Sequence, residues 1–240
     1  VGEQSGKTQD RGEVVPATDC VVACASVAPK GNKKYVALTF DEGPSGATKQ
    51  ILQVLKEKGV TATFFLSGDA AEASPATAKA IVDAGCEIGS NSYSDDSLKG
   101  QDREAVREQI TKGTDAIKSA TGVKTMLLRA PYAAFDEQNW IDAMDLVSAV
   151  VSWNIDSGDW LLNGGNIVLL TDRDECAEQT LEALPQIIDG LIADGYKIVT
   201  LSDLVKTDTS LSKKLTSLTK ATMPKDAVFP QLAEDDDTTE

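Results

Sequence analysis

Polar side chains that could act in catalysis or hold a cation follow the apolar segments of this sequence, one group after each segment. Each group alone has the composition of an ordinary turn, because Asp, Asn, Ser and Gly favour turns. Several groups together, with an arginine among the carboxylates, predict one acidic pocket that holds a hard cation or polarises a polar substrate. The groups are Asp41-Glu42-Gly43-Pro44, the stretch 90–96, Arg129-Ala130-Pro131-Tyr132, Asp156-Ser157-Gly158-Asp159-Trp160 and Thr171-Asp172.

The sequence contains no histidine, and this excludes several classes of catalytic site. Ser-His-Asp and Cys-His nucleophilic sites and HExxH metalloproteases all depend on an imidazole. The chemistry that remains must use carboxylates or the side chains of Arg, Lys, Tyr, Thr, Ser, Asn and Cys.

The cysteines offer little further chemistry. Only Cys20 and Cys24 are close in the sequence, and such a pair is half of a structural zinc site or the two ends of a short disulfide loop. The disulfide is favoured if the protein is exported. Cys86 is expected to be a small buried hydrophobe, and Cys176 to pack near the start of a helix.

The composition is that of a globular protein, since 41% of the 240 residues are hydrophobic. The net charge of −15 repels phosphate backbones and anionic membranes, so nucleic-acid binding is not expected. The apolar runs are too short for a transmembrane helix. The chain starts at Val1 without a signal-peptide pattern, which we interpret as a processed or trimmed start.

Strand-like and helix-like segments alternate between Lys34 and Val205. This alternation predicts a parallel sheet with helices outside it, and a barrel is favoured over an open sheet. In such a barrel the groups at the C-terminal ends of the strands form the active site. The predicted strands are 35–40, 62–66, 86–89, 125–128, 147–153, 167–171 and 197–201, and the predicted helices are 48–58, 74–85, 103–121, 137–144 and 177–194. Residues 1–33 are interpreted as an irregular arm, 34–206 as the domain, and 207–240 as an extension with an acidic tail.

On these motifs, the segment from Lys34 to about Val205 resembles the NodB-homology domain of the polysaccharide deacetylases, carbohydrate esterase family 4. The resemblance implies an α/β fold, a distorted (β/α)7-type barrel. It also implies metal-assisted hydrolysis of the acetamido groups of N-acetylated sugar polymers, such as peptidoglycan or chitin-like glycans. The matching stretches are 39–44 to T-F-D-D-G-P, 87–95 to E-I-G-N-H-T-Y-S-H, 129–132 to R-x-P-Y, 156–160 to D-x-x-D-W and 167–172 to I-x-L-x-H-D.

The resemblance also implies a role for each matching residue, and the retained roles are those of the base and its surroundings. Asp41 stands for the general base, Arg129 for the residue that orients it, and the Tyr132 backbone N–H for the oxyanion donor. The Asp159-Trp160 pair is retained, and Trp160 and the Tyr132 side chain are expected to contact the glycan. We expect Asp41 and Arg129 to form an ion pair, because an unpaired buried carboxylate is costly.

The metal and general-acid positions of the resemblance are not retained. Glu42 stands where the family has an aspartate, and Asn91 and Asp95 stand where it has two metal-binding histidines. Thr171 replaces the histidine that acts as general acid. An oxygen-only set of this kind suits calcium, magnesium or manganese better than zinc. We favour the interpretation in which Asn91 and Asp95 are hydrogen-bond formers of their loop without a ligand role, so that no metal is expected.

Three functions remain open on these residues. The first is a catalytically degenerate polysaccharide deacetylase domain that binds a glycan or a cell-surface protein. The second is an active N-deacetylase that uses an oxygen-only metal site. The third is a structural or interaction module of the cell surface. The resemblance implies an extracellular or cell-surface location for all three.

Overall fold

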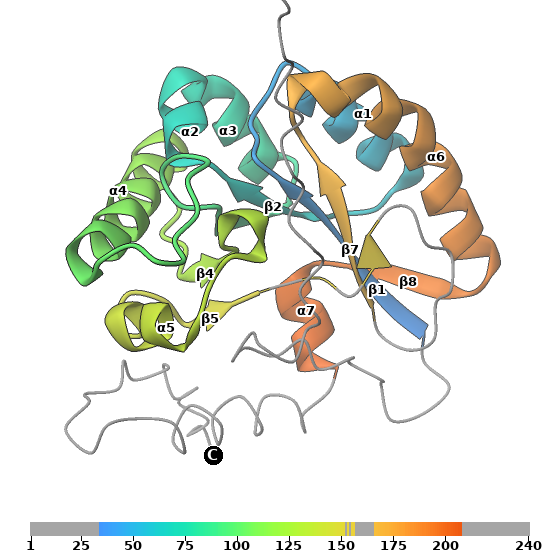
Figure 1. Cartoon of the computed structure of the whole chain (residues 1–240). Coiled ribbons are helices and arrows are strands. Elements are labelled where there is room, and N and C mark those ends of the chain that lie inside the picture. The colour runs from blue at the N-terminus through green and yellow to red at the C-terminus, as the bar shows by residue number, and fades with distance from the viewer. Residues whose placement is uncertain (1–33, 152, 154, 157–165, 208–240) are drawn as a thin grey trace, which may run out of the picture.

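The strands of the protein form one parallel sheet (Figure 1). The structure is a computed structural model, and it describes residues 34–151, 153, 155–156 and 166–207. The strands are β1 (Lys34–Asp41), β2 (Thr63–Leu66), β3 (Glu87–Ser90), β4 (Leu127–Leu128), β5 (Ala149–Val150), β6 (Ile155–Asp156), β7 (Asn166–Thr171) and β8 (Tyr196–Val199).

The sheet curls into a half-barrel. Its strand order is β5-β4-β3-β2-β1-β7-β6, and β8 pairs with the first half of β1. Strands β5 and β6 stand at opposite ends of this order, although only residues 151–154 separate them in the chain. Five residue steps span at most about 18 Å, so the two ends of the sheet must approach each other. The predicted parallel, barrel-like α/β architecture is therefore confirmed.

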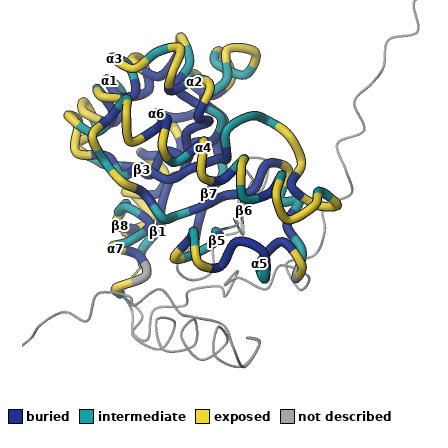
Figure 2. Tube along the Cα trace, turned by 90° about the vertical axis from the view of Figure 1, so that its left-hand side faces the viewer, coloured by how far each residue is buried: buried dark blue, intermediate teal, exposed yellow. Residues whose placement is uncertain are grey.

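The helices cover the outside of the sheet, with α1 and α6 together on one side of the view and α2, α3 and α4 on the other (Figure 1). The strands run through the buried interior, and the exposed residues lie on the outer sides of the helices (Figure 2). The helices are α1 (Thr48–Lys58), α2 (Gly68–Ala73), α3 (Pro75–Asp83), α4 (Arg103–Thr121), α5 (Glu137–Ala143), α6 (Ala177–Ala193) and α7 (Leu201–Lys206), with single 3-10 turns η1 (Pro131–Ala133) and η2 (Asp174–Cys176).

Helices α1 and α4 have the bounds that the sequence predicts, because both have clear end signals. The Asp102 side chain accepts a hydrogen bond from the Ala105 N–H at the start of α4. Gly59 and Gly122 follow the two helices in the left-handed conformation, with φ of 67° and 80°. The apolar positions of each helix recur at helical spacing and are buried against the sheet.

The core lies between the sheet and this helical layer. All residues of β2 and the last six of β1 are buried, as expected for central strands of a parallel sheet. Phe40 and Phe64 stack with ring centroids 4.8 Å apart. Cys86 is buried, as the sequence predicts. Trp140 packs in a second apolar cluster.

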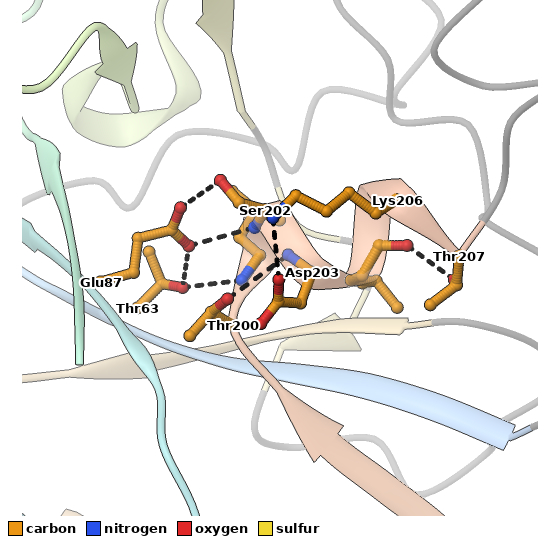
Figure 3. A network of polar contacts seen from close by, with 9 residues as sticks. Thr63, Glu87, Thr200, Ser202, Asp203, Lys206 and Thr207 are labelled. Atoms are coloured by element: carbon orange, nitrogen blue, oxygen red, sulfur yellow. Dashed lines mark hydrogen bonds and ion pairs between the residues drawn. The ribbon is translucent and has the colours of Figure 1, made fainter. Parts of the chain in front are cut away.

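Helix α7 closes the N-terminal end of the half-barrel through a polar network (Figure 3). Glu87 begins β3, and its carboxylate accepts hydrogen bonds from the Ser202 N–H and hydroxyl. The Thr63 hydroxyl, at the start of β2, accepts from the Leu201 N–H at 2.9 Å. The predicted strand 197–201 is therefore wrong at its end, because strand pairing stops at Val199 and Leu201 begins a helix.

Other predicted elements also differ from the structure. The predicted strand 147–153 is reduced to β5, and the chain then forms the separate strand β6 beside β7. Helix α2 was not predicted, since six small and acidic residues show no apolar periodicity. The expectations for the arm 1–33, the pair Cys20 and Cys24, and the tail 208–240 lie outside the described residues. Within the described residues, no helix is both long and apolar enough to span a membrane.

Two helical glycines give matched tests of this packing. At Gly113 in α4, an added Cβ would lie 2.5 Å from the carbonyl carbon and oxygen of Ser92, whereas at Gly190 in α6 it would meet nothing within 4 Å. Gly113→Ala should therefore lower the free energy of unfolding by about 1–3 kcal/mol through overpacking against backbone. Gly190→Ala should raise it by up to about 1 kcal/mol, because alanine favours helix. Urea unfolding of both variants measures this, and equal effects would contradict the close packing of α4 on the 91–96 loop.

Candidate functional site

The loops that follow β1, β3, β4 and β7 meet at the C-terminal ends of the strands. Tyr132, after β4, and Arg173, after β7, both contact Asp95, after β3. Backbone strain is concentrated in the same loops, because residues other than glycine rarely adopt positive φ and do so preferentially at functional sites. Among the described residues, those with positive φ other than glycine are Glu42, Ser92, Tyr132 and Ala133.

Arg129 and Asp41 form the expected ion pair across the interior of the half-barrel. Arg129 Nη1 donates to Asp41 Oδ1 and to Thr39 Oγ1, each at 2.7 Å. Its Nε donates to the Val151 carbonyl at 3.2 Å, and its guanidinium carbon lies 4.2 Å from the centre of the Phe65 ring. Arg129 is 1% exposed, so the pair is held in a fixed geometry by packing as well as by charge.

Asp41 has the surroundings of a general base. Burial raises the pKa of Asp41, and the charge and hydrogen bond of Arg129 oppose this rise. A carboxylate with a raised pKa that an arginine orients is suited to accept a proton from water. The ion pair is the expected contact, while the roles of Asp41 as general base and of Arg129 as the residue that orients it stay predictions.

Glu42 and Asp95 are joined by an arginine that sequence reasoning missed. Arg173 follows β7, and its Nε contacts the Glu42 carboxylate while its Nη2 donates to Asp95 Oδ2 at 2.5 Å. Burial raises the pKa of Glu42, and Arg173 opposes that rise while Asp95 and Asp41 add to it. The only feature of the sequence that could have indicated Arg173 as a site residue is its position directly after the strand-end pair Thr171-Asp172.

Asn91 is buried directly after the end of β3, four residues before Asp95, and its side-chain oxygen has no hydrogen-bond partner. Its Nδ2 donates to the Arg129 carbonyl oxygen at 2.9 Å, and the residue is 2% exposed. Asn91 Oδ1 and Asp95 Oδ1 are buried and have no hydrogen-bond partner. Asn91 and Asp95 each form hydrogen bonds through one side-chain atom, to partners outside their own loop, and the expectation that they bind no metal stays a prediction.

Tyr132 presents its ring to solvent and its hydroxyl to the site. The residue is 59% exposed, and its hydroxyl donates to Asp95 Oδ2 at 2.6 Å. That hydrogen bond raises the pKa of Tyr132 to about 12. The Tyr132 N–H takes part in none of the turn and loop hydrogen bonds of the described residues, and its role as oxyanion donor stays a prediction.

Thr171 lies beside Asp41, and the residue after it has a structural role. Thr171 and Asp41 are register partners of β7 and β1. The Asp172 carboxylate is fully buried and accepts hydrogen bonds from the hydroxyls of Ser45 and Thr48 at 2.7 and 2.6 Å. It holds the loop after β1 in place. Asp159 and Trp160 lie outside the described residues.

The side chains at the expected metal position do not fit zinc. They offer only oxygen atoms, whereas zinc sites in proteins contain imidazole or thiolate. Two of the three residues, Glu42 and Asp95, already bind a guanidinium. No group of three or more Asp, Glu, Cys or His in the described part of the chain is arranged to hold a metal ion. We therefore derive no catalytic step that uses a metal here.

Comparison with known proteins matches the chain to one family. A family model described as polysaccharide deacetylase matches residues 28–147. The bifunctional xylanase/deacetylase of Pseudobutyrivibrio xylanivorans is 35% identical over 186 residues, which cover 72% of this chain and 31% of that protein. A peptidoglycan-N-acetylglucosamine deacetylase of Bacillus cereus is 31% identical over 84% of this chain and 79% of its own length.

Solved structures give the same match. The carbohydrate esterase family 4 domain of a xylanase from the hindgut metagenome of Trinervitermes trinervoides has a TM-score of 0.66 and 32% identity, covering 73% of this chain and 91% of that one. A pseudoenzyme of this family from Bacillus anthracis has a TM-score of 0.66 and 30% identity, covering 74% and 66%. The chain spans 31% to 44% of the lengths of the first curated relatives.

The buried ion pair makes a stability prediction. Arg129→Met should lower the free energy of unfolding by about 3–5 kcal/mol, because it leaves the Asp41 carboxylate buried without its cation. Adding Asp41→Asn should recover part of that loss. The matched control is Arg107→Met, since Arg107 pairs with Asp145 on the surface, and its cost should stay below about 1 kcal/mol. Equal costs for Arg129→Met and Arg107→Met in urea unfolding would contradict a structural role for the buried pair.

The hydrogen bond between Tyr132 and Asp95 makes a spectroscopic prediction. Phenolate absorbance, taken as the difference between the parent and Tyr132→Phe, should show Tyr132 ionising with a pKa of about 12. Asp95→Asn should lower this pKa toward the ordinary tyrosine value, because it removes the negative charge that disfavours the phenolate. The phenol is the form that donates, so the hydrogen bond should persist up to the pKa. An unchanged value in Asp95→Asn would show that the hydroxyl does not bind Asp95 in solution.

Proposed function

Because the chain belongs to the polysaccharide deacetylase family, we propose that it binds N-acetylated sugar polymers without hydrolysing their acetamido groups. The domain retains the general base and the residue that orients it, but it lacks the groups that activate water and protonate the leaving amine. It acts as a catalytically degenerate member that binds glycan.

One observation supports the loss of catalysis above all others. In a chain without histidine, the residues at two of the three metal positions, Glu42 and Asp95, are ion-paired with Arg173. At the general-acid position, the hydroxyl of Thr171 is too weak an acid to protonate a leaving amine near neutral pH as an imidazolium does. A missing general acid alone typically costs about 10²–10⁴ in rate, and the loss of metal activation adds to this. Such losses at one site are not additive, but together they leave little turnover.

The features that remain suit glycan binding. The Tyr132 ring is exposed above the site, and an aromatic ring is a common surface for the apolar face of a sugar. The Tyr132 N–H and the free acceptor of Asn91 offer a donor and an acceptor for an acetamido group. The expected groove residue Trp160 lies outside the described residues.

The relatives support a glycan of the cell wall as the ligand. Several of them are named peptidoglycan deacetylases, acting on N-acetylglucosamine or N-acetylmuramic acid. We propose peptidoglycan-like or chitin-like polymers as ligands here, and an extracellular or cell-surface location. The similar Bacillus anthracis protein is described as a pseudoenzyme, and a mutant of it as having restored enzymatic activity. The family therefore includes at least one other protein described as a pseudoenzyme.

A second function has its own supporting observation. The buried and unpartnered oxygens Asn91 Oδ1 and Asp95 Oδ1 are the kind of atom that a hard divalent cation binds. An active deacetylase with calcium, magnesium or manganese would use them. We favour the degenerate function because Arg173 competes for the same carboxylates.

Binding and turnover are tested together with chitooligosaccharides. The parent should bind N-acetylglucosamine oligomers in calorimetric titration and release no acetate with zinc, manganese, magnesium or calcium added. Tyr132→Ala should weaken binding about tenfold, as a central aromatic contact does.

The matched control is Ile192→Ala, since Ile192 is the other exposed large hydrophobic residue of the described chain and lies on α6. Its binding should equal that of the parent. Acetate release by the parent above the metal-free background would overturn the degenerate function. Loss of binding in both variants alike would overturn the assignment of Tyr132.

A further inference from the structure

We infer that Arg173 is the built-in cation of the pocket: its guanidinium takes the place of a divalent metal between Glu42 and Asp95. The inference has a second part. When Arg173 is removed, the oxygens it leaves behind form a site for a hard divalent cation. Both parts concern the contacts of Arg173 and the binding of a metal, so they are tested by metal binding in the absence of any glycan.

The position of Arg173 supports the first part. It is the third residue of the stretch Thr171-Asp172-Arg173, which begins in the last residue of β7. From there, its side chain reaches the loop after β1 at Glu42 and the loop after β3 at Asp95. These are two of the three positions where the sequence predicts metal ligands. One guanidinium thus joins three loops, as a bound ion would.

The balance of charge in the site explains why a cation is needed between Glu42 and Asp95. The site contains the carboxylates Asp41, Glu42 and Asp95, and Arg129 is paired with Asp41. Glu42 and Asp95 would otherwise lie close together without a cation, and each is partly withdrawn from water, with side chains 23% and 32% exposed. Like charges so placed repel, and a counter-charge between them removes the repulsion. Arg173 supplies that charge.

Arg173 remains a cation under all relevant conditions. Burial lowers the pKa of Arg173, but the hydrogen bond to Asp95 and the charges of Glu42 and Asp95 outweigh it and raise the pKa further. A guanidinium also fits two carboxylates better than a lysine ammonium, because its planar fork donates in fixed directions. The positive charge of Arg173 is therefore permanent, whereas a weakly held metal would exchange.

The atoms left without Arg173 form a hard ligand set. Glu42 and Asp95 would offer carboxylate oxygens with a charge that matches a divalent ion. Asn91 Oδ1 and Asp95 Oδ1 are already buried without hydrogen-bond partners. Carboxylate and amide oxygens are ligands of calcium and manganese, and their lack of nitrogen and sulfur disfavours zinc. With two carboxylates, we expect a weak site, with a dissociation constant on the order of 0.1–1 mM for calcium.

Terbium luminescence provides the direct test, with the metal alone as probe. Tyr132 donates to Asp95 at 2.6 Å, so a terbium ion bound at Asp95 lies close enough to the phenol to be sensitised by it. Arg173→Ala should bind terbium at least about tenfold more tightly than the parent, and calcium or manganese should displace the terbium. Asp95→Asn added to Arg173→Ala should abolish the gain.

The control variants separate this effect from a general loss of positive charge. Arg107→Ala removes another ion-paired arginine, on the surface and away from the site, and its terbium signal should equal that of the parent. Arg173→Lys should also stay close to the parent, because an ammonium keeps a cation between the carboxylates.

Thermal unfolding gives a second measurement that does not depend on luminescence. In buffer with chelator, Arg173→Ala should unfold at a lower temperature than the parent, because Glu42 and Asp95 then repel each other. Calcium or manganese at several millimolar should raise its Tm, whereas the parent should not respond, since a ligand stabilises only a protein that binds it. This comparison also shows that the variant folds.

Two results would overturn the inference. The first is a parent that binds terbium or manganese as tightly as Arg173→Ala and loses this binding in Asp95→Asn. The second is a folded Arg173→Ala protein that binds no more metal than Arg107→Ala. Acetate release by the parent would instead refute the proposed function, so the two failures are distinguishable.

Discussion

The buried ion pair between Arg129 and Asp41 is the interaction on which the rest of the site depends. Arg129 comes from the end of β4 and crosses the interior to β1, where it binds Asp41 and the hydroxyl of Thr39. Its guanidinium lies against the Phe65 ring and also near Trp153, so it occupies the space that apolar side chains fill elsewhere in the core. Removing either charge would leave the other buried, and this constrains the distance between β4 and β1, which are not neighbours in the sheet. The loops that bear the candidate residues start from these strands.

The two arginines of the site neutralise different carboxylates in different surroundings. Arg129 is 1% exposed and compensates a carboxylate inside the half-barrel. Arg173 has a side chain 38% exposed and joins two carboxylates that belong to separate loops. In the function proposed above, the second arrangement keeps a positive charge where the family resemblance implies a metal ion, without the Lewis acidity of a metal. A binding pocket can keep its shape in this way while it loses the means to activate water.

Much of the fold could be predicted from local pattern. Helix α4 is an example, because a capping Asp102, a regular apolar spacing and a terminal Gly122 all act within one segment. The predictions that are wrong involve long-range pairing. The strand predicted over 147–153 keeps only two paired residues, because β5 and β6 must join opposite ends of a curled sheet. Leu201 is apolar and follows a strand, but the carboxylate of Glu87 and the hydroxyl of Thr63 are placed to bind the first N–H groups of a helix there.

The sequence by itself determined the class of the fold, the absence of imidazole chemistry and the retained pair Asp41 and Arg129, since residue types and strand-end positions suffice for these. It also marked Glu42, Asn91 and Asp95 as oxygen groups at one edge of the sheet. Only the tertiary structure decided what these groups contact. Arg173 lies 131 positions from Glu42 and 78 from Asp95 in the numbering of the chain. No local pattern signals a contact at such separations. An ion pair forms only where loops come within the reach of a side chain, and the curvature of the sheet sets that distance.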